Sequence, residues 1–341
     1  ELTYPGASFV KVHFEDFRPP PGLVIEVRNP SGTESYLYTR DHKDSRTFDA
    51  EMGDDGELNF YSMSISGETA VIEVQGHRGY IKSGGKAFKG RVFVDHVVRG
   101  LEIEKGAASL SSSRKSKGGH SLDVESSGGF LTESNCGLME RVDAVCWAGS
   151  DPEAYDRSQP VAWLVTRTSG CTAWRAGPDN HLFTNNHCIS DQAATSASEV
   201  WFNYEKSVCG GDETETIVKV PAEQLITTDN TLDFTLFSVT DFSAIESFGN
   251  LGLEVREAVL GETIYIPQHG AGDPKQISID SDMNQTGACQ VDDESLYGRD
   301  FDTDIGYYCD TTGGSSGSPV LLAGSHKAIA LHHQGGCLNS G

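Results

Sequence analysis

Short apolar segments separated by turn residues recur along almost the whole chain, and this pattern constrains the fold more than any other feature. The segments are rich in β-branched and aromatic residues and partly alternate apolar with polar positions, which is typical of strands. Amphipathic helical periodicity is nearly absent. Clear examples are SFVKVHFEDF, LVIEVRNP, SYLYTR, FYSMSIS, TAVIEVQG, RVFVDHVV, VAWLVTR, HLFTNN, EVWFNY, DFTLFSV, ETIYIP, SPVLLA and KAIALHH. The sequence therefore predicts an all-β protein without an internal repeat.

The strand segments fall into two groups with a different kind of sequence between them. Residues 106–131 contain GAASLSSSRKSKGGHSLDVESSGG, which is Ser/Gly-rich with few apolar anchors and predicts a flexible linker. Residues 1–105 predict a β-sandwich. Residues 132–341 predict a second all-β unit, either a pair of barrels or a sandwich. Basic residues at 114, 115 and 117 offer a proteolytic site. The first unit is therefore expected to be either a binding module or a propeptide, and the sequence leaves both open.

Charge and hydropathy restrict the partners of this chain. Among 341 residues, 26 are Lys or Arg and 50 are Asp or Glu, which gives a formal net charge of -24. Such a surface repels nucleic acid and anionic membranes. No apolar run approaches the roughly 20 residues of a membrane-spanning helix. The chain starts at Glu1 without a signal-peptide pattern, so we expect either a processed secreted protein or a fragment.

The cysteines indicate the compartment. All eight lie after residue 135, and no Cys-x-x-Cys spacing occurs among them. This argues against a zinc ribbon or a thioredoxin motif and favours four disulfides in an oxidising, extracellular compartment. The alternative is a set of buried free thiols in a cytosolic protein. Eight cysteines allow 105 pairings, so the sequence alone does not fix the connectivity.

A Gly/Ser-rich turn in the second unit has the composition of a nucleophile loop. In DTTGGSSGSPV, residues 310–320, small residues that tolerate unusual backbone angles surround Ser316. Such a turn can present the Ser316 hydroxyl while the N–H groups of Gly314 and Ser316 converge as an oxyanion hole. The alternative is an ordinary flexible loop.

A serine nucleophile needs a base and a group that orients the base. His187, in FTNNHCISD, is the candidate base. Asp233, at the start of the apolar strand DFTLFSV, is the candidate orienting carboxylate, with Asp229 as the fallback. The competing interpretation of the His-Cys pair is half of a metal site, but no set of four ligands is apparent. No metal and no cofactor are predicted. The acidic loop at residues 54–57 lacks the full ligand spacing of a calcium site.

The motifs TNNHC, DFTL and GSSGSPV, in this order, resemble the chymotrypsin-like serine endopeptidases. WFNYEKSVC and YYCDTTGGSSGSPV resemble the bacterial lysyl and glutamyl endopeptidase branch over about residues 134–341. The resemblance implies two six-stranded β-barrels with the site between them. It also implies that His187 is the general base, Asp233 its orienting group and Ser316 the nucleophile, with Gly314 and Ser316 forming the oxyanion hole.

The same resemblance implies a disulfide pattern. A bridge between Cys171 and Cys188 would anchor the loop that carries His187. The other implied pairs are Cys146 with Cys209, Cys136 with Cys337, and the remaining two, Cys289 with Cys309.

Two departures from the family pattern affect the expectations. Ser315 stands where animal trypsins have an aspartate that pairs with the freed amino terminus, so activation by that insertion is not expected. The sequence stops at GGCLNSG, before the family's last strand and C-terminal helix. We therefore expect either a fragment or an incomplete second barrel, whose exposed strand edge could impair activity.

The substrates implied are proteins or peptides. Asp310, six residues before Ser316, occupies the pocket-floor position of trypsin-like members and predicts cleavage after Lys or Arg. His333, in LHHQGG, resembles the histidine with which glutamyl endopeptidases hold an acidic side chain. The lysyl branch's own specificity aspartate would lie beyond the last residue. We favour basic substrates and keep two alternatives: glutamyl specificity, and a catalytically impaired protease-like binding protein. The oligomeric state is not predicted.

Overall fold

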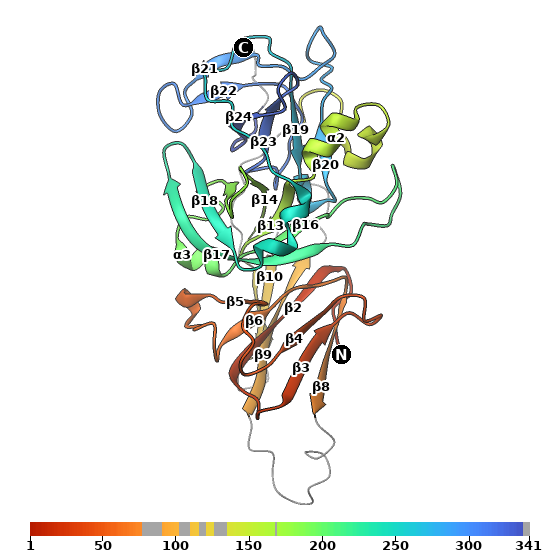
Figure 1. Ribbon diagram of the computed structural model, residues 1–341, viewed down its shortest axis with the longest axis vertical. Coiled ribbons are helices and arrows are strands. Elements are labelled where there is room, and N and C mark those ends of the chain that lie inside the picture. The colour runs from red at the N-terminus through yellow and green to blue at the C-terminus, as the bar shows by residue number, and fades with distance from the viewer. Residues whose placement is uncertain (77–90, 102–109, 116–120, 126–134, 168, 337–341) are drawn as a thin grey trace, which may run out of the picture.

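The computed structural model describes residues 1–76, 91–101, 110–115, 121–125, 135–167 and 169–336 (Figure 1). These residues form strands with few short helices, as predicted. The helices are α2 (Pro152–Ser158), α3 (Gln192–Ser196) and the 3₁₀ turns η1 (Ala50–Met52), η2 (Ala144–Ala148), η3 (Phe242–Ala244), η4 (Glu246–Phe248) and η5 (Gly270–Gly272). None of the described helices is long and apolar enough to cross a membrane.

The N-terminal unit is a sandwich of two sheets. One sheet has the order β1-β8-β3-β4, with β1 (Leu2–Thr3), β3 (Leu23–Arg28), β4 (Ser35–Tyr38) and β8 (Thr69–Gly76). The other has the order β11-β10-β9-β2-β6-β5, and β7 also pairs with β2. Its strands are β2 (Ala7–Arg18), β5 (Arg46–Thr47), β6 (Phe60–Ser62), β7 (Ile65–Ser66), β9 (Arg91–Leu101), β10 (Leu110–Lys115) and β11 (Ser121–Glu125).

Both faces of strand β2 are covered by other parts of the protein, so most of its residues are buried. Val10, Val12 and Phe14 point into the sandwich core. Phe9, on the other face, packs edge-on against Trp163 and Trp201 of the second unit. Because successive strand residues face opposite sides, one strand serves both the sandwich core and the contact between the units.

Part of the predicted flexible linker over residues 106–131 is strand in the structure. Residues 110–115 and 121–125 form β10 and β11, which extend the sheet from β9 by antiparallel pairing. Main-chain hydrogen bonding to an available strand edge has overridden a composition that is typical of linkers. The remaining residues of the predicted linker lie outside the described ranges.

The second unit begins with a closed barrel in the order β13-β14-β15-β18-β17-β16. Its strands are β13 (Val161–Val165), β14 (Gly170–Arg175), β15 (Leu182–Thr184), β16 (Glu199–Phe202), β17 (Val218–Asp229) and β18 (Phe234–Val239). The barrel interior is aliphatic and aromatic, with Leu164, Val200 and Phe237 fully buried. This barrel confirms the predicted chymotrypsin-like architecture for the first half of the unit.

A five-stranded sheet follows in the order β12-β20-β19-β23-β24. Its strands are β12 (Val142–Asp143), β19 (Ile264–Gln268), β20 (Gln276–Ser278), β23 (Pro319–Leu322) and β24 (Ala328–Leu331), and β21 (Asp293–Leu296) pairs separately with β22 (Asp304–Gly306). Within the described residues this sheet is open, in contrast to the closed barrel beside it. The described residues of the expected second barrel thus form a five-stranded sheet.

Candidate active site

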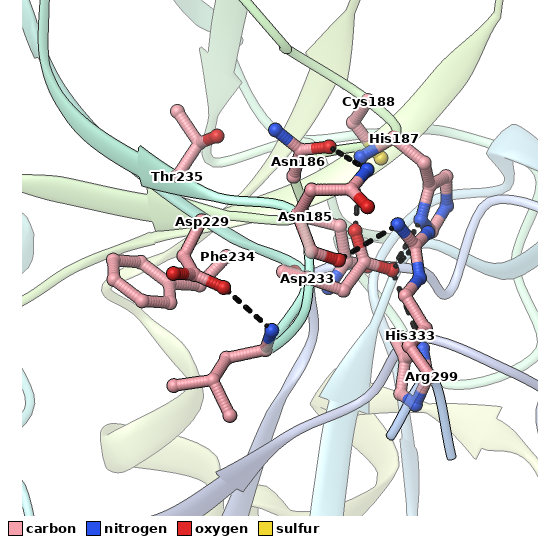
Figure 2. A network of polar contacts seen from close by, with 12 residues as sticks. Asn185, Asn186, His187, Cys188, Asp229, Asp233, Phe234, Thr235, Arg299 and His333 are labelled. Carbon is pink, nitrogen blue, oxygen red and sulfur yellow. Dashed lines mark hydrogen bonds and ion pairs between the residues drawn. The ribbon is translucent and has the colours of Figure 1, made fainter. Parts of the chain in front are cut away.

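His187 and Asp233 meet at the edge of the closed barrel. His187 follows β15 and Asp233 precedes β18, and these two strands are hydrogen-bonded neighbours. Nδ1 of His187 lies 2.7 Å from Oδ2 of Asp233, and the His187 backbone N–H donates to Oδ1 over 3.0 Å (Figure 2). The Asp233 residue is 1% exposed. A buried carboxylate that is hydrogen-bonded to both the ring and the backbone of a histidine fixes the orientation of the ring.

The two asparagines before His187 hold the turn that carries Asp233. The Asn185 side chain donates to the Asp233 carbonyl oxygen over 2.8 Å, and the Asn186 N–H donates to the same oxygen over 3.2 Å. The Asn186 side chain also donates to Thr228. Asp233 has φ of +50°, a left-handed conformation that is unfavourable for most residues. These hydrogen bonds maintain it. Asp229 instead accepts from the Leu232 N–H (Figure 2), so the fallback residue is part of the turn.

The Asp233 carboxylate has two further cationic neighbours. Nη2 of Arg299 lies 2.9 Å and Nδ1 of His333 lies 3.3 Å from its Oδ2 (Figure 2). Burial opposes ionisation of Asp233, but hydrogen bonds from His187 and His333 outweigh it and hold its pKa well below the usual range. The carboxylate is therefore ionised throughout the neutral range and is shared among three donors.

His333 bridges two carboxylates. Its Nε2 lies 2.6 Å from Oδ2 of Asp304, on the side of the ring opposite Asp233. Burial disfavours its charged form, yet hydrogen bonds to Asp233 and Asp304 raise the pKa of His333 to about 9. The ring is thus a cation at neutral pH and belongs to the network around Asp233.

The loop that carries Ser316 is hydrogen-bonded to β14, which pairs with β15, the strand that precedes His187. The Thr172 N–H, in β14, donates to the Ser316 carbonyl oxygen over 2.8 Å, and the Thr172 hydroxyl donates to the Gly314 carbonyl oxygen over 2.9 Å. A Cβ on Gly317 would lie 2.1 Å from the Thr172 carbonyl oxygen. The glycine after Ser316 is therefore required by the close approach of two backbones. Ser316 itself is 7% exposed.

Neutral hydrogen bonds secure the Ser316 loop where trypsins use an aspartate. The Ser315 hydroxyl donates to Gln268 Oε1 over 2.5 Å and accepts from the Thr312 N–H over 3.0 Å. Gly314 has φ of +101°, and a Cβ there would lie 2.8 Å from the His269 carbonyl oxygen. The predicted oxyanion-loop glycine thus sits at a position that a larger residue could not occupy without strain.

Asp310 occupies a different environment from the one predicted. It is 1% exposed, and its two carboxylate oxygens accept hydrogen bonds from the backbone N–H groups of Cys136 and Glu140, over 2.7 and 2.6 Å. Burial raises the pKa of Asp310 despite these two bonds. The carboxylate anchors the segment that enters the second unit, and this geometry does not support its predicted pairing with a substrate cation.

A cavity of about 720 Å³ lies beside His333. First-barrel residues form one wall and residues of β24 and the β21–β22 hairpin form the others. The lining includes Trp174, Phe183, Phe234, Leu253, Leu296, Tyr297, Asp304, Ile329, Leu331 and His333. The lining thus combines aromatic and aliphatic side chains with the Asp304–His333 pair.

Three predicted disulfides are present: Cys146–Cys209, Cys171–Cys188 and Cys289–Cys309. The second links β14 to the residue after His187, so the strand under the Ser316 loop and the loop of the candidate base are covalently joined. The fourth predicted pair, Cys136–Cys337, includes a residue outside the described ranges.

Arg299 and Asp304 are the site residues that sequence reasoning missed. Arg299 lies between β21 and β22, and Asp304 is the first residue of β22, in a stretch of mixed polar residues without a motif. Nothing in their local sequence indicates proximity to Asp233, which is 66 residues away from Arg299. Only the tertiary arrangement brings these charges together.

Comparison with known proteins agrees with the architecture. Residues 141–339 match the family model of the lysyl endopeptidase C-terminal domain. Secreted RxLR effector protein 73 of Plasmopara viticola is 28% identical over 349 aligned residues, which span 99% of this chain and 78% of that protein.

The solved structures that match part of this chain include a Glu endopeptidase and the Rv3671c protease. A Glu endopeptidase is 18% identical, with a TM-score of 0.40, and the match covers 59% of this chain and 87% of that one. The active form of the Rv3671c protease from M. tuberculosis is 13% identical, with a TM-score of 0.39, and the match covers 64% of this chain and 85% of that one. Because the domain match covers more than half of the chain, the protein belongs to the lysyl endopeptidase C-terminal domain family.

Proposed function

We propose that the protein is a serine endopeptidase in which Ser316 is the nucleophile, His187 the general base and Asp233 its orienting group. The observation that carries the proposal is the 2.7 Å hydrogen bond between His187 Nδ1 and the buried carboxylate of Asp233. The position of the Ser316 loop supports the proposal. The loop is hydrogen-bonded to β14, and a disulfide links β14 to the loop that carries His187.

The reaction follows from the roles of these groups. Nε2 of His187 accepts the Ser316 hydroxyl proton as Oγ attacks the peptide carbonyl carbon, and Asp233 stabilises the resulting imidazolium. The N–H groups of Gly314 and Ser316 bind the oxyanion. His187 then protonates the leaving amine, which departs and leaves an acyl-enzyme. A water molecule, deprotonated by His187, attacks this ester, and His187 returns the proton to Ser316 Oγ as the acid product leaves.

For the substrate class we propose peptides cleaved after Lys or Arg. Membership of the lysyl endopeptidase family and the net charge of -24 support a basic substrate. Because the Asp310 carboxylate is occupied by backbone N–H groups, a substrate cation would need another acceptor. Glutamyl specificity through His333 is the less favoured alternative, since that ring is already held between Asp233 and Asp304.

The proposed location is extracellular. The three disulfides and the similarity to a secreted effector support an oxidising compartment.

Active-site labelling tests the proposed catalytic residue. The full chain is treated with a fluorophosphonate, and the modified residue is located by peptide mass spectrometry. We expect a single adduct on Ser316 that is absent from Ser316→Ala and greatly reduced in His187→Ala. Labelling elsewhere, or no labelling of a sample whose folding is verified, would reject the catalytic assignment.

A mixed peptide library measures the specificity. We expect cleavage after Lys or Arg, with Ser316→Ala as the inactive control. Cleavage after Glu would favour the glutamyl alternative.

A catalytically impaired binding protein is the second candidate function. Two observations favour it. Arg299 and His333 compete with His187 for the Asp233 carboxylate, and a relative that matches 99% of this chain is named as an effector. Failure of both labelling and library cleavage in the folded chain would support this candidate.

A further inference from the structure

A cluster of two imidazoles and two carboxylates lies in the N-terminal unit, away from the candidate active site. His13 is on β2, and Asp95 and His96 are consecutive on the neighbouring strand β9. Ligand atoms of these three residues lie within 4.8 Å of one another. We propose that His13, Asp95 and His96 bind a divalent transition-metal ion of the zinc type through two imidazole Nδ1 atoms and a carboxylate oxygen. The proposal is independent of the proposed function.

A β-bulge creates this convergence. Val12 pairs with Val97 and Phe14 pairs with Val94, so the single residue His13 faces both Asp95 and His96. In a regular strand, consecutive residues point to opposite faces, and only one of the two could reach His13. Bulges re-aim side chains in this way and are over-represented next to functional sites.

Both Nδ1 atoms point at the same carboxylate. His13 Nδ1 is hydrogen-bonded to Oδ1 of Asp95, and His96 Nδ1 lies 2.9 Å from its Oδ2. The two rings stack with centroids 4.2 Å apart. A metal ion bound to both Nδ1 atoms would take the two rings as neutral ligands.

The opposite nitrogen of each ring already has a partner of the kind found behind metal ligands. His13 Nε2 lies 2.9 Å from Oδ1 of Asp54, and His96 Nε2 lies 2.8 Å from the Tyr61 hydroxyl. Metal-bound histidines usually donate their second N–H to a carboxylate or another oxygen, which fixes the tautomer and the ring orientation. Here one ring has a carboxylate and the other a hydroxyl in that place.

Charge and accessibility also suit a divalent cation. The His13 and Asp54 side chains are 6% and 5% exposed, whereas the Asp95 side chain is 24% exposed and gives an approach from solvent. The two carboxylates supply two negative charges, which a divalent ion balances with both imidazoles neutral. Binding requires both Nδ1 atoms to carry no proton, and the Tyr61 oxygen is placed to accept a hydrogen bond from the Nε2–H of His96. Three protein ligands leave a fourth position for water.

The described residues contain one other cluster with the spacing of metal ligands, and it is not available to a metal ion. It consists of Cys171, His187 and Cys188. Its two sulfurs are joined in a disulfide and therefore cannot act as thiolate ligands.

Zinc binding to the full chain tests the proposal. Chelator-treated Ser316→Ala protein is dialysed against Zn²⁺, and bound zinc is measured by atomic emission. We expect one tightly bound ion per chain. We expect His13→Asn and His96→Asn to weaken binding by at least about 100-fold, while His42→Asn, which changes an exposed histidine of the same unit, and His187→Ala retain it.

Tyr61→Phe provides a variant that keeps every ligand if the histidine variants fail to fold. We expect its zinc affinity to fall by about 10–100-fold, and we expect Zn²⁺ to raise the thermal unfolding midpoint of the parent more than that of this variant. No tight zinc binding to the parent, zinc retained in folded His13→Asn and His96→Asn, or an unchanged affinity in Tyr61→Phe would overturn the proposal. The cluster would then be a hydrogen-bond network between β2, β6 and β9.

Discussion

At the scale of single residues, Asp233 is the most heavily shared side chain of the site. Its carboxylate contacts the side chains of His187, Arg299 and His333. Its backbone has a left-handed conformation, which a hydrogen bond from Asn185 stabilises. Each added cation stabilises the ionised carboxylate but also shields the charge that His187 would use during catalysis. The balance between these two effects can be measured separately in stability and in activity.

His333→Gln tests the contribution of the shared network to stability. The pKa of His333 is raised to about 9 in the folded state, compared with about 6.5 when unfolded. Its contribution is therefore fully present below pH ~6.5 and is lost as the pH rises through about 9. We expect the variant to be less stable by on the order of 3 kcal/mol at pH 6 and by much less above pH 9.5.

The measurement is urea unfolding of His333→Gln and its parent across this pH range. His42→Gln changes an exposed histidine and should follow the parent at every pH. A destabilisation by His333→Gln that does not vary with pH would contradict the assigned charge.

Arg299→Met tests the shielding of Asp233. Without the guanidinium, the Asp233 carboxylate keeps more of its negative charge for the imidazolium that His187 forms during the reaction. If the protein is a peptidase as proposed, we expect kcat/KM at a fixed, mildly alkaline pH to rise by a few-fold. Arg256→Met, which removes a surface guanidinium bound to Glu262, is the control. An unchanged or lower kcat/KM in a folded Arg299→Met variant would count against the shielding.

At the scale of elements, two contacts define how the Ser316 loop meets the first barrel. Thr172, in β14, hydrogen-bonds with the carbonyl oxygens of both Gly314 and Ser316, and the Cys171–Cys188 disulfide ties that strand to the His187 loop. The loop is thus positioned by a strand of the other half of the unit. Backbone geometry at Gly317 makes this close approach possible.

Gly317→Ala is expected to displace the loop. The residue has φ of +89°, and a Cβ would lie 2.1 Å from the Thr172 carbonyl oxygen and 2.6 Å from the Thr184 hydroxyl. We expect a loss of about 2 kcal/mol or more in stability, since strain and steric overlap combine, together with a large loss of fluorophosphonate labelling. Gly313→Ala is the matched control because a Cβ there meets no atom within 4 Å. Equal effects of the two variants would contradict this account.

At the scale of the whole molecule, the two units share a buried charge network. Lys11 Nζ lies 3.4 Å from Glu199 Oε2, and Lys219 Nζ lies 2.5 Å from Glu34 Oε1 and 3.7 Å from the centre of the Trp201 ring. Two residues of the network come from the N-terminal unit and two from the first barrel. This interface makes the N-terminal unit an integral partner of the barrel in the described chain.

Glu199→Gln tests the importance of this network. The substitution leaves Lys11 and Lys219 buried with a single counter-charge, and removing one partner from a buried ion pair typically costs about 3–5 kcal/mol. Glu73→Gln, which removes a half-exposed partner of Arg28, should cost less than about 1 kcal/mol. Denaturant unfolding in the Ser316→Ala background measures both. Similar values for the two variants would contradict a stabilising interface.

Sequence patterns predicted the all-β architecture and the pairing of His187 with Asp233, whereas the three observed disulfide pairs were implied by the family resemblance. Strand patterns, turn residues and short motifs are local features of the sequence, so they can be recognised without knowledge of the fold. Residues 106–131 were predicted wrongly in part, because β10 and β11 pair through the backbone with an edge that the sequence does not reveal. Composition predicts the side-chain preference of such a segment but not the availability of a partner strand.

The sequence by itself determined which residue types could carry chemistry, and the tertiary structure decided which of them meet. Asp310 was a candidate by position, but its carboxylate became a buried acceptor for the backbone of residues 136 and 140. Arg299 had no motif, yet it reaches Asp233, and a bulge aligned His13 with Asp95 and His96. The physical reason is that electrostatic and hydrogen-bonding interactions act over a few ångströms in space, whereas sequence patterns record only neighbours along the chain.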